Sequence, residues 1–104
     1  MIQVVASLTI NPDEQDALQD YFQVASQLME KYEGKLVQRL ELGNPVIGEK
    51  VTEIIMVVEY PDFAVVQEIF LSDEYKSVQN ARDRAFLKYN ICLVDRNEYT
   101  ADIA

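Results

Sequence analysis

Residues 59–82 read EYPDFAVVQEIFLSDEYKSVQNAR, and this stretch decides the fold. Before it lies a dense apolar run that predicts a strand over 52–60, which the proline ends because proline lacks the N–H that a strand ladder needs. The apolar spacing after the proline predicts a short helix over 62–71. Ser72 can cap a second helical segment, whose spacing continues to Tyr89. The stretch therefore predicts a strand, a helix and a restarted helix in succession.

The remaining segments complete a βαββαβ order. Alternating apolar residues predict strands over 2–10 and 35–42, and 90–96 is predicted to be the last strand. An apolar stripe at spacings of three and four predicts a helix between the first two strands. We expect Asn11 to cap this helix and Gly34 to end it in a left-handed conformation. Two right-handed crossovers in this order predict an α+β, ferredoxin-like fold, with a four-stranded antiparallel sheet and both helices on one face.

The predicted strands are apolar on both faces, although the helices can cover only one. An uncovered apolar sheet face normally marks an interface. The simplest cover is the same face of a second copy, so the sequence predicts a homodimer through the open sheet face, which makes a dimeric α+β barrel. The residues expected on that face are Val5, Val37, Ile55, Val57 and either Cys92 or Leu93.

Length and charge limit the class of protein. The 104 residues are enough for a single domain, which we expect to span residues 1–104. Because 18 acidic residues against 9 basic ones give a net charge of −9, the chain repels phosphate backbones and anionic lipid. We therefore expect no nucleic acid and no membrane as partners. No segment resembles a signal peptide or a transmembrane span, so we expect a cytoplasmic protein.

Three residue types that often carry chemistry are scarce. The chain has no histidine, no tryptophan and one cysteine, Cys92. Histidine is the commonest general base near neutral pH and the commonest transition-metal ligand. Its absence excludes the usual nucleophilic triads, zinc sites and histidine-ligated haem, and we expect neither a metal nor a cofactor. Cys92 has apolar neighbours and is expected to be a buried strand thiol.

Parts of the deciding stretch resemble a known family. They are the corner over 59–62, the run over 69–75, and Arg82 seven residues further on. The chain resembles, over about residues 4–95, an uncharacterised family catalogued among domains of unknown function under number 1330. The resemblance implies a ferredoxin-like dimeric α+β barrel, a group that also holds antibiotic-biosynthesis monooxygenases, haem-degrading enzymes and muconolactone-isomerase-like proteins. It implies no particular activity, because none is established for the family.

The best candidate for a ligand-binding site is Arg82 with Tyr75. Placed seven residues apart on one helix, they would lie on the same face, about two turns apart. A guanidinium group offers a planar fork of donors for a carboxylate or a phenolate, and the tyrosine hydroxyl can orient such a ligand. The alternative is a structural ion pair of Arg82 with Glu74 or Asp83, since acidic residues outnumber basic ones two to one.

Three further residues are candidates for the same role. Glu59 and Arg39 are charges in otherwise apolar strands, where an unpaired charge is costly. They either line a cavity, where a carboxylate can act as a general base, or form a cross-strand ion pair. Tyr21 either lines a pocket between the helices and the sheet or is a core residue with its hydroxyl at the rim.

Two classes of function follow, and the sequence leaves open whether the protein is an enzyme. The first is a protein that binds a small apolar or carboxylated metabolite. The second is a cofactor-independent isomerase or monooxygenase-like enzyme that acts on a small carbonyl or phenolic substrate. Convergence of Arg82 and Glu59 on one cavity would favour the enzyme, and their separation would favour binding or a purely structural role. No catalytic residue is assigned.

Overall fold

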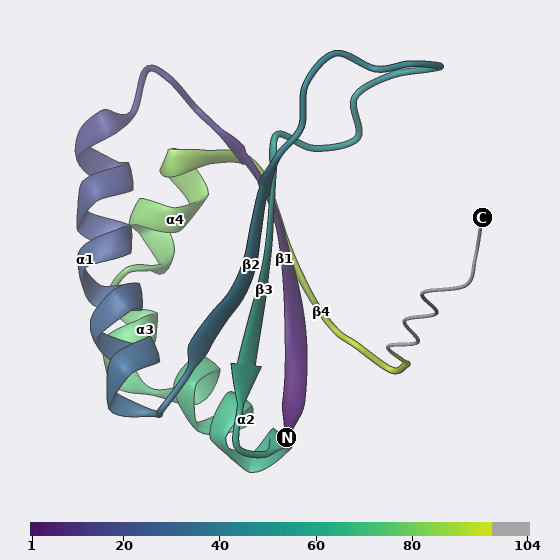
Figure 1. Ribbon diagram of the computed structural model, residues 1–104. Coiled ribbons are helices and arrows are strands. Elements are labelled where there is room, and N and C mark those ends of the chain that lie inside the picture. The colour runs from purple at the N-terminus through teal and green to yellow at the C-terminus, as the bar shows by residue number, and fades with distance from the viewer. Residues whose placement is uncertain (97–104) are drawn as a thin grey trace.

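The computed structural model describes residues 1–96. Its elements are β1 Ile2–Ile10, α1 Gln15–Lys31, β2 Lys35–Glu41, β3 Ile54–Tyr60, α2 Phe63–Leu71, α3 Asp73–Lys76, α4 Gln79–Ala85 and β4 Phe86–Leu93. The four strands form one antiparallel sheet in the order β2–β3–β1–β4. The helices all lie on one face of this sheet (Figure 1). The predicted α+β, ferredoxin-like fold is therefore confirmed.

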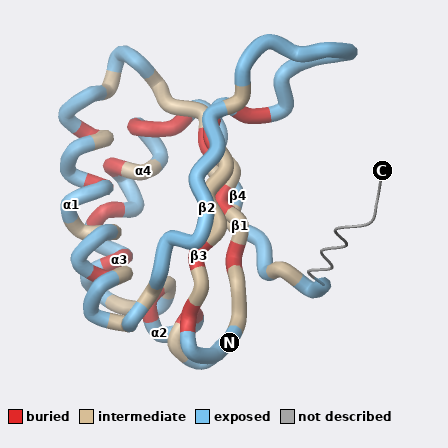
Figure 2. The backbone as a smooth tube through the Cα atoms, in the orientation of Figure 1, coloured by how far each residue is buried: buried red, intermediate tan, exposed pale blue. Residues whose placement is uncertain are grey.

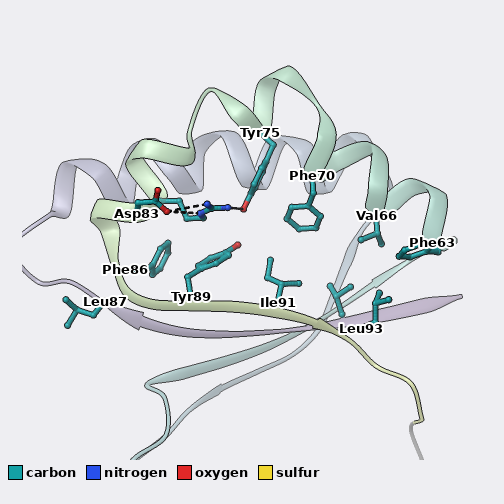
Figure 3. Close-up of a pocket in the computed structure, with 12 residues that line it drawn as sticks. Phe63, Val66, Phe70, Tyr75, Asp83, Phe86, Leu87, Tyr89, Ile91 and Leu93 are labelled. Atoms are coloured by element: carbon teal, nitrogen blue, oxygen red, sulfur yellow. Dashed lines mark hydrogen bonds and ion pairs between the residues drawn. The ribbon is translucent and has the colours of Figure 1, made fainter.

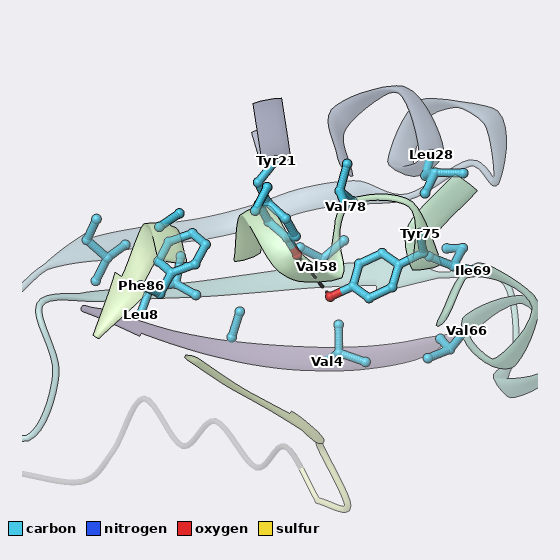
Figure 4. Close-up of a cluster of buried hydrophobic side chains, with 14 of the residues drawn as sticks. Val4, Leu8, Tyr21, Leu28, Val58, Val66, Ile69, Tyr75, Val78 and Phe86 are labelled. Carbon is cyan, nitrogen blue, oxygen red and sulfur yellow. Dashed lines mark hydrogen bonds between the residues drawn. The ribbon is translucent and has the colours of Figure 1, made fainter. Parts of the chain in front are cut away.

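The hydrophobic core fills the space between the helices and the covered face of the sheet (Figure 4). On β1, Val4, Ala6 and Leu8 are buried, as the predicted alternation over 2–10 requires. Figure 2 shows buried segments in the central strands and the helices, whereas β2 is exposed along its whole length. The helices therefore cover the two central strands and leave β2 as an exposed edge.

The first helix does not begin where the sequence predicted. Asn11 does not cap α1, because its Oδ1 accepts a hydrogen bond at 3.1 Å from the N–H of Asp13, only two residues on. This local Asx turn competes with helix capping. The N–H of Asn11 also donates to the carbonyl of Ala85 at 2.8 Å. Asn11 thus connects the end of β1 to the end of α4, and α1 begins later, at Gln15.

Gly34 ends α1 for a different reason from the predicted one. The left-handed conformation belongs to Glu33, whose φ is 60°. A Cβ atom at Gly34 would lie 2.6 Å from Cγ of Met29 and 2.6 Å from Cε1 of Tyr60. Gly34 is therefore required by close packing against Tyr60, and not by a positive φ.

The restarted helix is shorter than predicted and is broken in two. Ser72 caps α3 as expected, because its Oγ accepts a hydrogen bond at 3.1 Å from the N–H of Tyr75. The helical region then breaks between α3 and α4, and β4 begins at Phe86, four residues before the predicted start. Phe86 and Tyr89 continue the apolar spacing of the helix, which explains the wrong boundary. Tyr89 consequently lies on a strand.

The second face of the sheet carries no helix (Figure 1). Val5 pairs in register with Val57 on one side and with Cys92 on the other, and Leu40 pairs with Ile55. Paired residues share a face, so these five side chains gather on the uncovered side, which we call the open face. Of the two alternatives at the end of β4, Cys92 is the one that lies there. It is exposed rather than buried, because nothing within one chain covers this face.

Candidate functional site

A cleft with a volume of about 610 Å³ lies between β4 and helices α2 to α4 (Figure 3). Strand β4 forms one wall through every second residue, since alternate side chains of a strand point to the same side. Apolar side chains of α2 form the facing wall, and α4 contributes Arg82 and Asp83 to the lining, with Asp83 at the end of the cleft away from Phe63. The cleft is therefore apolar along most of its length and polar at one end. Its apolar walls are formed by Phe86, Leu87, Tyr89, Ile91 and Leu93 from β4, Phe63, Val66 and Phe70 from α2, and Val4 from β1.

The structure brings Arg82 and Tyr75 together, although not on one helix as predicted. Nη1 of Arg82 donates a hydrogen bond to the Tyr75 hydroxyl oxygen at 3.2 Å, across the break between α3 and α4. The guanidinium carbon also lies 5.7 Å from the ring centroids of both Tyr75 and Tyr89, a distance at which a cation is attracted to an aromatic face. The Arg82 side chain is 26% exposed, so it is mostly removed from water.

Three tyrosine hydroxyls meet beside Arg82. Tyr21, from α1, has its hydroxyl 3.1 Å from that of Tyr75 and hydrogen-bonded to that of Tyr89. Burial, followed by the proximity of the neighbouring tyrosines, raises the pKa of both Tyr21 and Tyr89 above the usual value. Their hydroxyls therefore stay protonated at neutral pH. We call Tyr21, Tyr75 and Tyr89 the tyrosine cluster.

The cluster also forms the boundary with a second cavity. This cavity, of about 180 Å³, lies among apolar side chains of α1, the sheet and the α2–α3 region. Tyr21 lines the second cavity, whereas Tyr75 and Tyr89 line both it and the cleft. The sequence left two alternatives for Tyr21, and each describes it in part. Tyr21 lines a pocket, and at 3% exposure it is also a core residue.

The charge at the polar end of the cleft is shared by two neighbouring residues. Arg82 and Asp83 are the charged residues among those that line the cleft. They contact each other at 3.3 Å, but the Asp83 side chain is 71% exposed, so water weakens the ion pair. Burial lowers the pKa of Arg82, but the hydrogen bonds and charges of Tyr75 and Asp83 outweigh this effect and raise it overall. Arg82 therefore remains a cation facing the cleft.

Glu59 and Arg39 do not converge with Arg82 or with each other. Glu59 accepts a hydrogen bond at 3.1 Å from Nε2 of Gln3, its cross-strand neighbour on the open-face side. Arg39 pairs in register with Met56, which faces the helices, and its Nη1 contacts Glu41 at 2.8 Å. A shift of register in β2 sets this pairing, and it was not visible in the sequence. Glu59 and Arg39 thus lie on opposite faces of the sheet.

Sequence reasoning missed Tyr89 as a member of the site. It assigned Tyr89 to a helix because the residue continues the apolar spacing from Ala85. The signal that could have found it is the alternation of Tyr89, Ile91 and Leu93 with polar Lys88 and Asn90, which is typical of a half-buried strand.

The donor set of the cleft suits an anion better than a cation. An arginine and tyrosine hydroxyls donate hydrogen bonds, and a carboxylate or carbonyl oxygen can accept them. Over residues 1–96, no three His, Cys, Asp or Glu side chains gather closely enough to hold a metal ion. Within the same residues, no helix is both long and apolar enough to cross a membrane.

Comparisons with known proteins place this geometry in a family. The family model described as "Domain of unknown function (DUF1330)" matches residues 4–97. A comparison with curated proteins found no match.

Solved structures with the same fold include several proteins without an assigned function. A protein of unknown function from Rhodopseudomonas palustris has a TM-score of 0.79 and 18% identity, over 94% of this chain and 83% of that chain. A dimeric protein of unknown function with a ferredoxin-like fold, from Bacteroides fragilis, has a TM-score of 0.59 and 9% identity, over 89% of this chain and 93% of that chain. A candidate antibiotic biosynthesis monooxygenase from Caulobacter crescentus has a TM-score of 0.62 and 17% identity, over 93% of this chain and 90% of that chain. At these identities the likeness concerns the fold alone.

Proposed function

This chain belongs to the DUF1330 family, and we propose that it is a cytoplasmic homodimer that binds a small apolar or carboxylated metabolite in the cleft between β4 and helices α2 to α4. The observation that carries the proposal is the position of Arg82, a mostly buried cation at the polar end of a cleft whose remaining walls are apolar. Removing a cation from water is costly unless a partner compensates for it. Its one acidic neighbour in the cleft, Asp83, is exposed and offers little compensation.

An anionic ligand would complete this arrangement. A guanidinium group binds a carboxylate through two parallel hydrogen bonds, which are stronger and more directional than bonds between neutral groups. The volume of about 610 Å³ lies within the range of small-molecule sites. The aromatic and aliphatic walls would contact the rest of the ligand and exclude water from the ion pair.

Binding has more support than catalysis. The enzyme alternative, a cofactor-independent isomerase or monooxygenase acting on a carbonyl or phenolic substrate, needs a general base in the cavity. Glu59, the candidate for that role, bonds Gln3 on the side of the sheet away from the cleft. The similarity to the candidate monooxygenase from Caulobacter crescentus is 17% in sequence, so it supports a shared fold rather than a shared reaction.

The homodimer is proposed on the chemistry of the open face. Val5, Leu40, Ile55 and Val57 form an apolar surface across the sheet, and a second copy of the same surface would cover it in an isologous contact. The protein from Bacteroides fragilis that shares the fold is described as dimeric. Because the cleft is on the helix side, this contact would leave it accessible.

A thermal-shift screen with small aromatic and keto acids tests the proposal. A ligand at a hundred times its dissociation constant stabilises a folded protein by about 2.7 kcal/mol, which is a measurable rise in the melting temperature. We expect at least one acid to stabilise the protein, and we expect Arg82→Ala to abolish the effect.

Arg84→Ala is the matched control, because it removes the same charge from α4. Arg84 contacts Asn80 and Glu14 outside the cleft, so this variant should keep the full shift. A screen in which no acid stabilises the protein, or in which both variants lose the shift equally, would contradict the proposed site.

A further inference from the structure

We propose that the cleft selects an elongated monocarboxylate, whose carboxylate accepts hydrogen bonds from both Arg82 and Tyr89 while its apolar body lies along β4 toward Leu93. This inference rests on the proposed function and goes further, because it assigns Tyr89 a role in specificity and gives the ligand a direction and a length.

The cluster has one more hydroxyl proton than it uses internally. Three tyrosine hydroxyls supply three protons, but the hydrogen bonds of Tyr21 to Tyr75 and to Tyr89 use two of them. Arg82 adds no acceptor, because a guanidinium group only donates. One O–H group of the cluster is therefore not needed for these two bonds.

Arg82 determines which hydroxyl that is. Its Nη1 donates to the Tyr75 oxygen, and a hydroxyl that accepts from a charged donor becomes a stronger donor itself. In the two bonds of Tyr21, where either hydroxyl can donate, this favours Tyr75 as the donor to Tyr21 and Tyr21 as the donor to Tyr89. The chain of hydrogen bonds ends at Tyr89, whose own hydroxyl also interacts with that of Tyr75. A ligand carboxylate is a stronger acceptor than a tyrosine hydroxyl and would accept the hydrogen bond of the Tyr89 proton instead. Because burial raises the pKa of the Tyr89 hydroxyl, this proton is retained at neutral pH.

Tyr89 offers its proton at the polar end of the cleft. It lines the cleft, and Figure 3 shows its hydroxyl directed toward that of Tyr75, which accepts a hydrogen bond from Arg82. Arg82 uses three N–H groups within the described residues, one for Tyr75 and two for Asp83. Of the five N–H groups of a guanidinium, two are left for a ligand. The polar end thus presents Arg82 and Tyr89 donors side by side, and a carboxylate has the charge and acceptors to match them.

Asp83 opposes the binding of an anion at Arg82. Its carboxylate already occupies one side of the Arg82 guanidinium, through contacts of 3.3 and 3.4 Å. A ligand carboxylate must approach the remaining N–H groups against the charge of Asp83. Removing that charge should therefore strengthen the binding of an anion.

The apolar part of the cleft runs along β4. Tyr89, Ile91 and Leu93 are alternate residues of β4 and line one wall. At about 3.3 Å per residue, the four steps from Tyr89 to Leu93 span about 13 Å. Phe63 and Val66 face the far end, as Figure 3 shows. A ligand anchored at Arg82 would therefore need an apolar body of about that length to contact Leu93.

Calorimetric titration with decanoate, butanoate and decylamine tests the inference. We expect decanoate to bind at least about tenfold more tightly than butanoate, because its longer chain covers more apolar wall. We expect no binding of decylamine, since its ammonium group would face Arg82. Leu93→Glu should weaken the binding of decanoate and leave the affinity for butanoate unchanged.

Two variants test the donor pair directly. Tyr89→Phe removes the hydroxyl and keeps the ring, and it should weaken the binding of decanoate about tenfold. Tyr32→Phe, directly after the end of α1 and outside the cleft, should not. Asp83→Asn should tighten the binding of decanoate. This second variant keeps the test decisive even where Tyr89→Phe fails to fold. Decanoate binding that is unchanged in Tyr89→Phe and Asp83→Asn, or matched by decylamine, would overturn this inference and leave the proposed function standing. Absence of binding by every carboxylate, including the small acids of the thermal-shift screen, would overturn both.

Discussion

Arg82 on α4 and Tyr75 on α3 are joined by a hydrogen bond of 3.2 Å, although a break in the helix separates them. Through Tyr75 the bond extends to Tyr21 on α1, and through Tyr21 to Tyr89 on β4. Three consecutive elements, α3, α4 and β4, and the distant helix α1 thus contribute to one polar cluster in an apolar setting. The cluster both connects the helices to the sheet and places donors at the end of the cleft.

The buried tyrosines predict how stability depends on pH. In the unfolded chain their hydroxyls ionise near the usual pKa of about 10, whereas in the folded protein burial raises the pKa of Tyr21 and Tyr89. Above pH 10 the folded state therefore binds more protons than the unfolded state, so the stabilisation is complete below pH 10 and is lost as the pH rises further.

Urea unfolding between pH 8 and pH 11 measures this effect. We expect the contribution of these tyrosines to the free energy of unfolding to be nearly constant up to about pH 10. Above that pH it should fall by an amount approaching about 1.4 kcal/mol per pH unit for each such tyrosine. Tyr21→Phe should make the decline shallower. Equal declines in the wild type and in this variant would show that Tyr21 ionises normally in the folded protein.

Gly34→Ala should destabilise the fold. The new Cβ would lie 2.6 Å from side-chain atoms of Met29 and Tyr60, and such overpacking typically costs about 1–3 kcal/mol. Gly43→Ala is the matched control, because a Cβ at Gly43 has no heavy atom within 4 Å. Chemical denaturation should show a clear loss of stability for the first variant only; similar values for both would refute the packing role of Gly34.

A charge on the open face should disrupt the proposed dimer. Val57→Asp places a carboxylate at the centre of that face, between Val5 of β1 and Gln38 of β2. Burying this charge against a second copy is costly. Light scattering at micromolar concentration should give twice the mass of one chain for the wild type and a single-chain mass for the variant. Leu71→Asp, on the exposed end of α2, should remain dimeric. A monomeric wild-type protein would refute the barrel assembly.

Cys92 reports on the same interface. Its thiol is exposed on the open face of one chain, and a second copy would cover it. We therefore expect slow reaction with a thiol reagent in the wild type and fast reaction in Val57→Asp. Fast labelling in both proteins would place the interface elsewhere.

Local patterns in the sequence were enough to predict the fold. The alternation along β1 predicted its bounds correctly, and the Ser72 cap was placed correctly because capping depends on residues three positions apart. The helix-to-strand boundary at Phe86 was wrong, since apolar residues at 85, 86 and 89 satisfy a helical period as well as a buried strand. Packing between elements, and not local preference, decides that boundary.

The site was only half visible for a related reason. Arg82 and Tyr75 could be paired from their spacing, but Tyr89 and Tyr21 join them through the tertiary fold. Glu59 and Arg39 stood out as charges among apolar residues, yet which face each occupies depends on strand register. The register shift between Leu36 and Gln38 sets the pairing of Arg39 with Met56. No turn residue in this part of the sequence indicates the shift.

An NMR titration of the isotope-labelled protein with decanoate tests the central claim most directly, because it reports where the ligand binds. The cleft anchored by Arg82 predicts that the signals of the Arg82 side chain and of Leu87, Ile91 and Leu93 shift together and saturate. The signals of Val5 and Val57 on the open face should stay in place. Shifts concentrated on the open face, or no saturable shift at the Arg82 side chain, would contradict a binding site in this cleft.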